Sequence, residues 1–444
     1  MVNTYVGRRK KSSIFIEFFF LLFIVSLYTG TQFDSNINHI ITRVMGPLFV
    51  LYTLYKFNKS REKLPREFYL YGFFVLWSTT GFLFMIDTVS YFKYLKLIVQ
   101  IEILLFCVSY AILASKSIRA LFAGYLIFAV GMSIYMLLNP QIAYNFAYDP
   151  NYQLSSGGFN SNALGMMYLL GIIGIIYFWN RHRSVILKII FASIFTMFTY
   201  GVILAASRKT FMIFIVFILL YMYLNNLGTF RRNVLILVPI IFSLVFLYQF
   251  YQYVMDETYL GHRLRQYESI DHFRQESDRY EMAVEGWRFF LKNPITGLGL
   301  AQFRAHSKTG QYSHSDYFEV LSTTGLVGAV LYFSIYATLL LKLFRIKKFV
   351  KDKKIQDEIN LFISIIVSIL LLGLGAPIFL SIFLMPIVMG VAAYTSNIEI
   401  KYRTNSNKMI IKYNSANMNQ GRFNPSQAVL RNSNRKYLNP EGMD

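Results

Sequence analysis

The stretch from Asn293 to Gly328 holds the side chains best suited to chemistry. His314 lies three residues before an apolar helix that we expect to begin near Tyr317, and Asp316 and Glu319 follow it closely. A histidine exchanges a proton readily near neutral pH, and a nearby carboxylate can orient its ring. The spacing therefore makes His314 a candidate base and Glu319 a candidate orienting group.

A pair of adjacent cations is the second feature that suggests chemistry. Arg208 and Lys209 lie in a short turn between two apolar stretches, 186–206 and 210–226. In the topology derived below, this turn is on the outer side of a membrane, where basic residues are uncommon. An arginine fork binds phosphate oxygens in bidentate fashion, so the pair is a candidate site for an anionic group. The alternative is an interfacial anchor whose long side chains reach the lipid headgroups.

Lys96 and Asn162 are further binding candidates, and each leaves two interpretations open. Lys93 and Lys96 share one face of a helix expected over 92–114. There they could line a cavity for the same anion or extend to the headgroups. Asn162 opens a helix expected over 162–180, where it could contact substrate or cap the helix N-terminus.

The remaining histidines of this region do not predict a metal site. His262, His272 and His306 are not spaced as ligands on one turn of helix. Gly297-Leu298-Gly299 lacks the lysine of a phosphate-binding loop and is more typical of a tight turn.

The composition is that of a membrane protein. Of 444 residues, 55% are hydrophobic and only 15% are charged, whereas ordinary soluble domains carry about 25% charged residues. Apolar stretches of about 20 residues, enough to cross a bilayer, recur along the chain. We therefore predict an all-α polytopic membrane protein with about 12 transmembrane helices. They are expected at 14–30, 38–55, 67–86, 92–114, 118–138, 162–180, 186–206, 210–226, 233–254, 317–343, 359–376 and 377–397.

The net charge of +21 indicates orientation rather than nucleic-acid binding. Basic residues gather in alternate loops, such as Lys56–Arg66 and Lys342–Lys354, while the loops at 31–37, 87–91 and 139–160 contain none. Because cytoplasmic loops carry the excess of Lys and Arg, we expect both termini in the cytoplasm.

This topology divides the chain into four segments. Residues 1–254 form the first nine transmembrane helices, and 255–316 form a large outward loop before the tenth. Residues 317–400 form the last three, and 401–444 form a basic cytoplasmic tail that we expect to be disordered. A loop of about sixty residues is too long for a simple connection and usually carries function.

One amphipathic helix is predicted inside the large loop, from Asp278 to Asn293. A capping box opens it, and Asn293-Pro294 ends it. Four apolar side chains at helical spacing form a ridge: Tyr280, Val284, Trp287 and Leu291. We expect this ridge to pack on the membrane domain. Arg279 borders the ridge and would point toward that contact, whereas Arg288 lies on the opposite, solvated face.

Several short motifs follow one another in a fixed order between residues 155 and 330. They are Gly158-Phe159 with Asn162, Ser207-Arg208, Arg279 through Phe290, Asn293-Pro294, Gly297 to Leu300, Phe303, and His314 through Gly328. This order resembles the bacterial O-antigen ligase and polymerase family, whose last block reads His-Asn, two spacers, Leu-Glu and a closing Gly-Leu-Ile-Gly. In this chain Ser315 stands where asparagine is usual.

The resemblance implies a GT-C-like glycosyltransferase in a bacterial inner or plasma membrane, acting at its outer face. The donor and acceptor would be glycans carried on undecaprenyl pyrophosphate, and no metal, nucleotide sugar or other cofactor would be needed. A flippase and a chain-length regulator would be its partners.

The candidate residues fit that chemistry. Lipid pyrophosphate is a good leaving group, so the enzyme needs cations to hold it more than an acid to protonate it. Arg208, Arg279 and Lys96 can serve, with Lys209 beside Arg208. His314 would then take the proton from the acceptor hydroxyl.

The expected activity is polymerisation of lipid-linked repeat units into O-antigen, capsule or exopolysaccharide. A ligase that moves the finished glycan onto lipid A core or a protein is the alternative within the family. A glycolipid flippase or transporter is the alternative from another class. Transporters tend to show paired repeats and ionisable residues near the membrane midplane, whereas here the repeats are missing and the candidates cluster at the outer edge.

Overall fold

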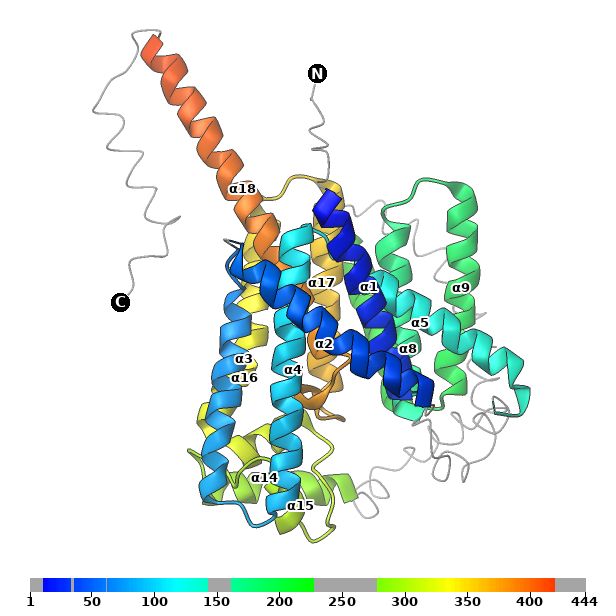
Figure 1. Cartoon of the computed structure of the whole chain (residues 1–444), viewed down its shortest axis with the longest axis vertical. Coiled ribbons are helices and arrows are strands. Elements are labelled where there is room, and N and C mark those ends of the chain that lie inside the picture. Colours follow the sequence, from blue (N-terminus) through cyan, green and yellow to red (C-terminus); the bar gives the residue numbers. More distant parts are fainter. Residues whose placement is uncertain (1–10, 33–35, 61, 143–160, 227–277, 420–444) are drawn as a thin grey trace. The chain divides into compact units, whose positions relative to one another are not determined.

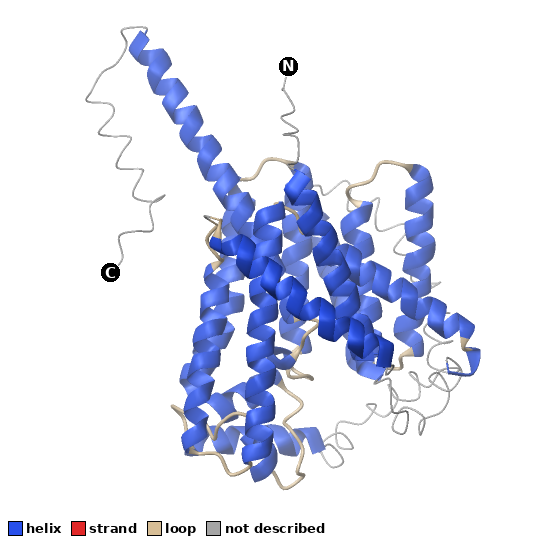
Figure 2. Ribbon diagram, in the orientation of Figure 1, coloured by secondary structure: helices blue, strands red, loops and turns tan. Residues whose placement is uncertain are grey.

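A computed structural model gives the chain as a set of packed helices (Figure 1) and describes residues 11–32, 36–60, 62–142, 161–226 and 278–419. Within these ranges every regular element is a helix (Figure 2). The chain divides into two compact units, Met1–Ser396 and Asn397–Asp444, and the contacts described below lie within the first.

The helices, in chain order, are α1 Lys11–Gln32, α2 Asn36–Asn58, α3 Arg66–Ser78, η1 Thr79–Leu83, α4 Thr88–Ser115, α5 Arg119–Leu138, α8 Ser161–Trp179, α9 Val185–Leu204, α10 Arg208–Asn226, α14 Asp278–Lys292, α15 Gln302–His306, α16 Asp316–Phe349, α17 Lys353–Leu372, η2 Ile378–Leu380 and α18 Met385–Asn419. Helix α1 packs on α2, α4 and α5, and α8 packs on α5, α9 and α10. Helix α16 packs along α3 and α17, and α17 also packs on α10.

Seven of the described helices are long and apolar enough to cross a membrane: α4, α5, α8, α9, α10, α16 and α17. A shorter apolar stretch, Ile14–Tyr28, lies in α1. The prediction of an all-α polytopic membrane protein is therefore confirmed. The transmembrane helix expected at 233–254 lies outside the described residues, so the total of about 12 stays a prediction.

The predicted boundary between the last two membrane segments is wrong. The sequence suggested adjoining segments at 359–376 and 377–397, but α17 ends at Leu372 and α18 begins at Met385. The intervening residues form an irregular segment, here termed the 373–384 loop. Its Gly373-Leu374-Gly375-Ala376-Pro377 sequence favours this break, because proline disfavours helical backbone at the residue before it and glycine weakens a helix.

Helix α16 is interrupted one-third of the way along, at Gly325. This residue has φ 66° and ψ −168°, a backbone conformation that is almost restricted to glycine. The interruption frees backbone groups that an unbroken helix would pair internally. The incoming loop satisfies them: Leu298 N–H donates to Ser322 O (2.8 Å), Gly299 N–H to Thr323 O (2.9 Å), and Leu326 N–H to Pro294 O (2.8 Å).

Glycines make this insertion possible because the two backbones touch. A Cβ on Gly297 would lie 2.6 Å from Gly325 N, and one on Gly325 would collide with the Ile295 carbonyl group. The expectation of a tight turn at Gly297-Leu298-Gly299 is confirmed, since both of its glycines have positive φ. The turn serves to insert this loop into the break in α16.

A buried glutamine fixes the same loop to the hairpin between α3 and α4. Gln302 is fully buried, and its Oε1 accepts the N–H groups of Ile86 (2.7 Å) and Asp87 (2.9 Å). Its Nε2 donates to Asp87 O (3.0 Å). One end of the bundle carries α14, α15 and the connection between α3 and α4. We call it the signature end.

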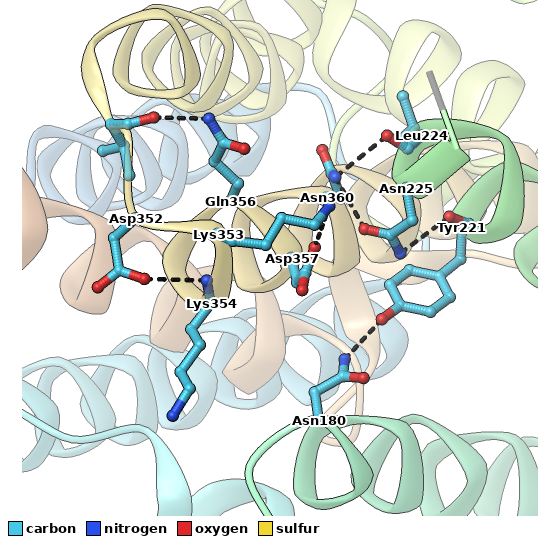
Figure 3. Close-up of polar contacts among 11 residues, drawn as sticks. Asn180, Tyr221, Leu224, Asn225, Asp352, Lys353, Lys354, Gln356, Asp357 and Asn360 are labelled. Atoms are coloured by element: carbon cyan, nitrogen blue, oxygen red, sulfur yellow. Dashed lines mark hydrogen bonds and ion pairs between the residues drawn. The ribbon is translucent and has the colours of Figure 1, made fainter. Parts of the chain in front are cut away.

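Polar side chains tie α8, α10 and α17 together at the other end of the bundle (Figure 3). Asn180 donates to Tyr221 Oη (2.6 Å), and Asn360 donates to Asn225 Oδ1 (2.9 Å) and to Leu224 O (3.1 Å). These bonds fix the far ends of the helices whose near ends form the candidate site.

The break at Gly325 generates a stability prediction. Gly325→Ala should unfold the signature end, because a side chain there adds about 1–3 kcal/mol of backbone strain and a collision with Ile295. Thermal unfolding of the purified protein in detergent measures the loss. Gly131→Ala is the matched control, since no atom lies within 4 Å of its Cβ position on α5. Equal melting temperatures for the two variants would contradict the account of the break.

Candidate active site

Helix α14 packs on α16 through a different face from the predicted one. Its buried side contains Met282 and Gly286, and a Cβ on Gly286 would lie only 2.9 Å from Phe318 Cβ. The small glycine lets the two backbones approach, so it sets the contact. Trp287 and Leu291 are 48% and 60% exposed. The prediction that the ridge of Tyr280, Val284, Trp287 and Leu291 packs on the membrane domain is therefore wrong.

Both arginines belong to α14 as predicted, but the predicted packing of the ridge, which distinguished Arg279 from Arg288, does not hold. Arg288 is exposed, as expected. Arg279 belongs to the first turn of α14, and its side chain lies outside the described part of the chain.

His314 lies in the loop immediately before α16. Its φ of 54° is left-handed, which is uncommon for a residue other than glycine. The ring is partly exposed and packs against the Tyr312 ring in a tilted arrangement, with 4.0 Å between the ring centroids. Its Nε2 lies 3.4 Å from Gln311 Oε1, a long and weak hydrogen bond. The imidazole is thus presented at the surface of the signature end by a strained backbone.

Residues 311–315, which include His314, are here called the histidine loop. Glu319 supports this loop through its backbone rather than through the His314 ring. The carboxylate is 2% exposed, and its Oε2 accepts the Ser313 N–H at 2.8 Å. Ser313 Oγ in turn donates to Ser315 O at 2.9 Å. Glu319 therefore fixes the residues on either side of His314, which makes it a positioning residue in this geometry.

Asp316 ties the first turn of α16 to the 373–384 loop. It is 3% exposed, and its Oδ1 accepts the N–H groups of Ile378 (2.7 Å) and Phe379 (3.1 Å). Its Oδ2 accepts the Tyr332 hydroxyl at 2.7 Å, and its own N–H donates to Gly373 O at 2.7 Å. Three of the four bonds join Asp316 to the 373–384 loop, more than fifty residues later in the sequence, and the bond to Tyr332 lies within α16.

The 373–384 loop also reaches the turn that carries Arg208 and Lys209, here called the cation turn. Lys209 Nζ donates to Gly375 O at 3.0 Å, and Ser315 Oγ makes a long, weak bond to Gly373 O at 3.4 Å, beside the 2.7 Å bond from the Asp316 N–H to the same carbonyl. Two loop carbonyl groups, two residues apart, therefore contact the cation turn on one side and the histidine loop on the other. The structure brings Lys209 and the residues next to His314 to one short piece of backbone.

The cation turn itself is held from α8. Ser207 Oγ donates to Asn162 Oδ1 at 2.8 Å and lies 2.9 Å from Thr210 Oγ1. Ala206 has φ 48°, so the chain turns sharply before α10. Arg208 is the first residue of α10 and is half-buried. A helix N-terminus carries a partial positive charge, which adds to that of the two cations.

The other candidates are less closely joined to this site. Lys96 is exposed on α4 and makes no hydrogen bond or ion pair within the described residues. His306 Nδ1 lies 2.8 Å from Gln302 O, while His262 and His272 fall outside those residues. No group of histidine, cysteine and acidic residues suited to a metal occurs in the ranges that the structure covers.

Sequence reasoning missed the 373–384 loop and the role of Asp316. Gly373-Leu374-Gly375-Ala376-Pro377, between two apolar segments, was the available signal, since glycine and proline mark a break. The contact between Asp316 and residues more than sixty positions later has no local signature.

The bonds of Asp316 generate a second prediction. Asp316→Ala should destabilise the 373–384 loop, because it leaves two buried N–H groups without an acceptor, at about 1–3 kcal/mol each. Asp316→Asn should be far milder, since its carbonyl oxygen can still accept both groups and its amide can donate to Tyr332. Limited proteolysis and thermal unfolding in detergent measure the difference. Equal damage from both variants would mean that the charge matters more than the geometry.

Comparison with known proteins identifies the central part of this arrangement. Residues 192–333 match the family model described as O-antigen ligase. The match runs from within α9 to Phe333 in α16, beyond its interruption, and so includes Arg208, Lys209, Arg279, His314 and Glu319. A comparison with curated proteins gives no match. The sequence resemblance to the O-antigen ligase and polymerase family is thereby confirmed over these residues.

Proposed function

We propose that the protein polymerises oligosaccharide repeat units carried on undecaprenyl pyrophosphate, at the outer face of a bacterial inner or plasma membrane. The products would be O-antigen, capsule or exopolysaccharide. The enzyme would be a GT-C-like, metal-independent glycosyltransferase with both termini in the cytoplasm. The observation that carries the proposal is the 373–384 loop, which contacts both the cation turn and the histidine loop.

The cation turn suits the leaving group. When the bond between the anomeric carbon and the pyrophosphate oxygen breaks, negative charge develops on the lipid pyrophosphate. Arg208 can pair with two of its oxygens, and the N-terminus of α10 adds positive potential. Lys209 donates a hydrogen bond to Gly375 O. Its ammonium group cannot bind in bidentate fashion, so it contributes positive charge. Arg279 and Lys96 would add further cations, and Asn162 would hold the turn through Ser207.

The histidine loop suits the acceptor. In the proposed step the acceptor hydroxyl oxygen bonds to the anomeric carbon of the donor, and its proton passes to His314. The lipid pyrophosphate leaves with the electron pair of the broken bond. Glu319 keeps the imidazole in place through Ser313, which makes the reaction depend on loop geometry.

Two alternatives remain distinguishable by experiment. A ligase would use the same donor but transfer the glycan to lipid A core or to a protein, so the acceptor that supports turnover separates it from a polymerase. A flippase would move the lipid-linked glycan across the bilayer and form no new glycosidic bond. A flippase and a chain-length regulator would act as partners of the polymerase.

Charge binding by the arginines gives a third prediction. Arg208→Ala should reduce transfer about 10²–10³-fold, while Arg208→Lys should restore only part of it, because a lysine cannot bind in bidentate fashion. Arg279→Ala should be severe, whereas Arg288→Ala, the matched control one helix face away, should be mild. Transfer is measured in proteoliposomes with a lipid-pyrophosphate-linked glycan. Strong loss with Arg288→Ala and none with Arg279→Ala would reverse the assignment.

The role of His314 gives a fourth prediction. His314→Gln should lower single-turnover transfer about 10²–10⁴-fold without weakening donor binding, because glutamine can hydrogen-bond but cannot take the proton. His306→Ala is the matched control and should retain activity. Rates are followed between about pH 5.5 and pH 8, where a histidine changes protonation. Wild-type rates for His314→Gln would exclude a histidine base and leave catalysis to the cations and to positioning.

A further inference from the structure

The exposed ridge of α14 carries large apolar side chains in a row. Trp287 and Leu291 are 48% and 60% exposed, and Ile295, in the turn that follows the helix, is 63% exposed. These three side chains are here called the exposed ridge. At about 100° per residue, Trp287 and Leu291 point away from the buried face that contains Met282 and Gly286. The helix therefore has one apolar face packed on α16 and a second apolar face whose side chains are about half exposed or more.

This ridge is continuous with a surface that must contact lipid. Pro294 O accepts the Leu326 N–H at 2.8 Å, so the C-terminal end of the ridge adjoins α16 just after its interruption. Helix α16 is long and apolar enough to cross a membrane, and after its interruption it exposes Leu326 and Val330. Apolar side chains exposed on such a helix face the hydrocarbon of the bilayer. The lipid-facing surface of α16 thus runs directly onto Ile295 and Leu291.

The position of α14 in the bundle agrees with this contact. The helix runs crosswise to α3 and α4 at the signature end (Figure 1). At the same end, the connection between α3 and α4 exposes Phe82, Leu83 and Ile86. Gln302 ties that connection to the loop that follows α14. Two segments that are hydrogen-bonded to each other therefore expose apolar side chains at this end.

The charges of α14 complete an amphipathic pattern. Glu281, Arg288 and Lys292 are exposed and lie along one edge of the helix, turned by roughly a quarter of a circle from the ridge. A helix with an apolar face, a charged edge and a tryptophan is typical of one that lies in the plane of a membrane interface. Arg288 and Lys292 can reach the lipid phosphates from there.

We propose that α14 lies in the bilayer interface at the signature end, with Trp287, Leu291 and Ile295 inserted among the lipids. The exposed ridge then contacts the lipids of the membrane. Insertion fixes the depth of α14 and brings its first turn, with Arg279, to the level of the phosphate groups. This inference does not depend on the reaction that the protein catalyses.

Spin labels on single cysteines in the full chain test the insertion. The only native cysteine, Cys107, is buried in α4, and Cys107→Ala supplies the background. Trp287→Cys, Leu291→Cys and Ile295→Cys report on the ridge. Glu281→Cys, Arg288→Cys and Lys292→Cys report on the charged edge. Val330→Cys is the lipid-facing reference, and the protein is reconstituted in phosphatidylcholine vesicles with some phosphatidylglycerol.

Collision with molecular oxygen, which concentrates in lipid, is compared with collision with a water-soluble nickel chelate. Labels on the ridge should favour oxygen, as at position 330, and labels on the charged edge should favour nickel several-fold more. Nickel access at 287 and 291 equal to that on the charged edge would place the ridge in water and overturn the proposal. Low access to both reagents would also overturn it, since protein would then cover the ridge.

Discussion

The interruption of α16 at Gly325 is the constraint on which the signature end depends. A helix broken near a bilayer leaves backbone N–H and C=O groups without partners, and each such group is costly away from water. Residues 294–299 supply the partners, so the loop can occupy only one place. The contact is between backbones, and it therefore requires glycine at 297 and 325.

Buried carboxylates extend the same principle to the rest of this end. Asp316 and Glu319 accept backbone N–H groups from the 373–384 loop and from Ser313. Irregular backbone at membrane depth is tolerated where protein groups satisfy it, and these two side chains do so for segments that precede and follow α16. The helix thus acts as the fixed support against which both loops are placed.

The sequence predicted the parts of this architecture that have a local signature. Apolar stretches located the membrane helices, and a tight turn was anticipated at Gly297-Leu298-Gly299. The face of α14 was predicted wrongly because hydrophobicity marked Trp287 and Leu291, whereas Gly286 sets the contact through its small size. The 373–384 loop was missed because its apolar residues resemble the start of a membrane helix. Only the tertiary bonds of Asp316 and Lys209 reveal it.

The candidate site therefore consists of two halves that are built independently. The cation half is formed by α8 and α10, where Asn162 holds Ser207. The histidine half is formed by α14, α16 and the loop between them. Among the described residues, the 373–384 loop contacts both halves through carbonyl groups only two residues apart. Both halves bond to backbone carbonyl groups of this loop, so the distance between the cation turn and the His314 imidazole depends on the backbone geometry of the loop. A reaction that needs a phosphate site and a base at a set separation would gain from this arrangement, because one short piece of backbone accepts a hydrogen bond from each half.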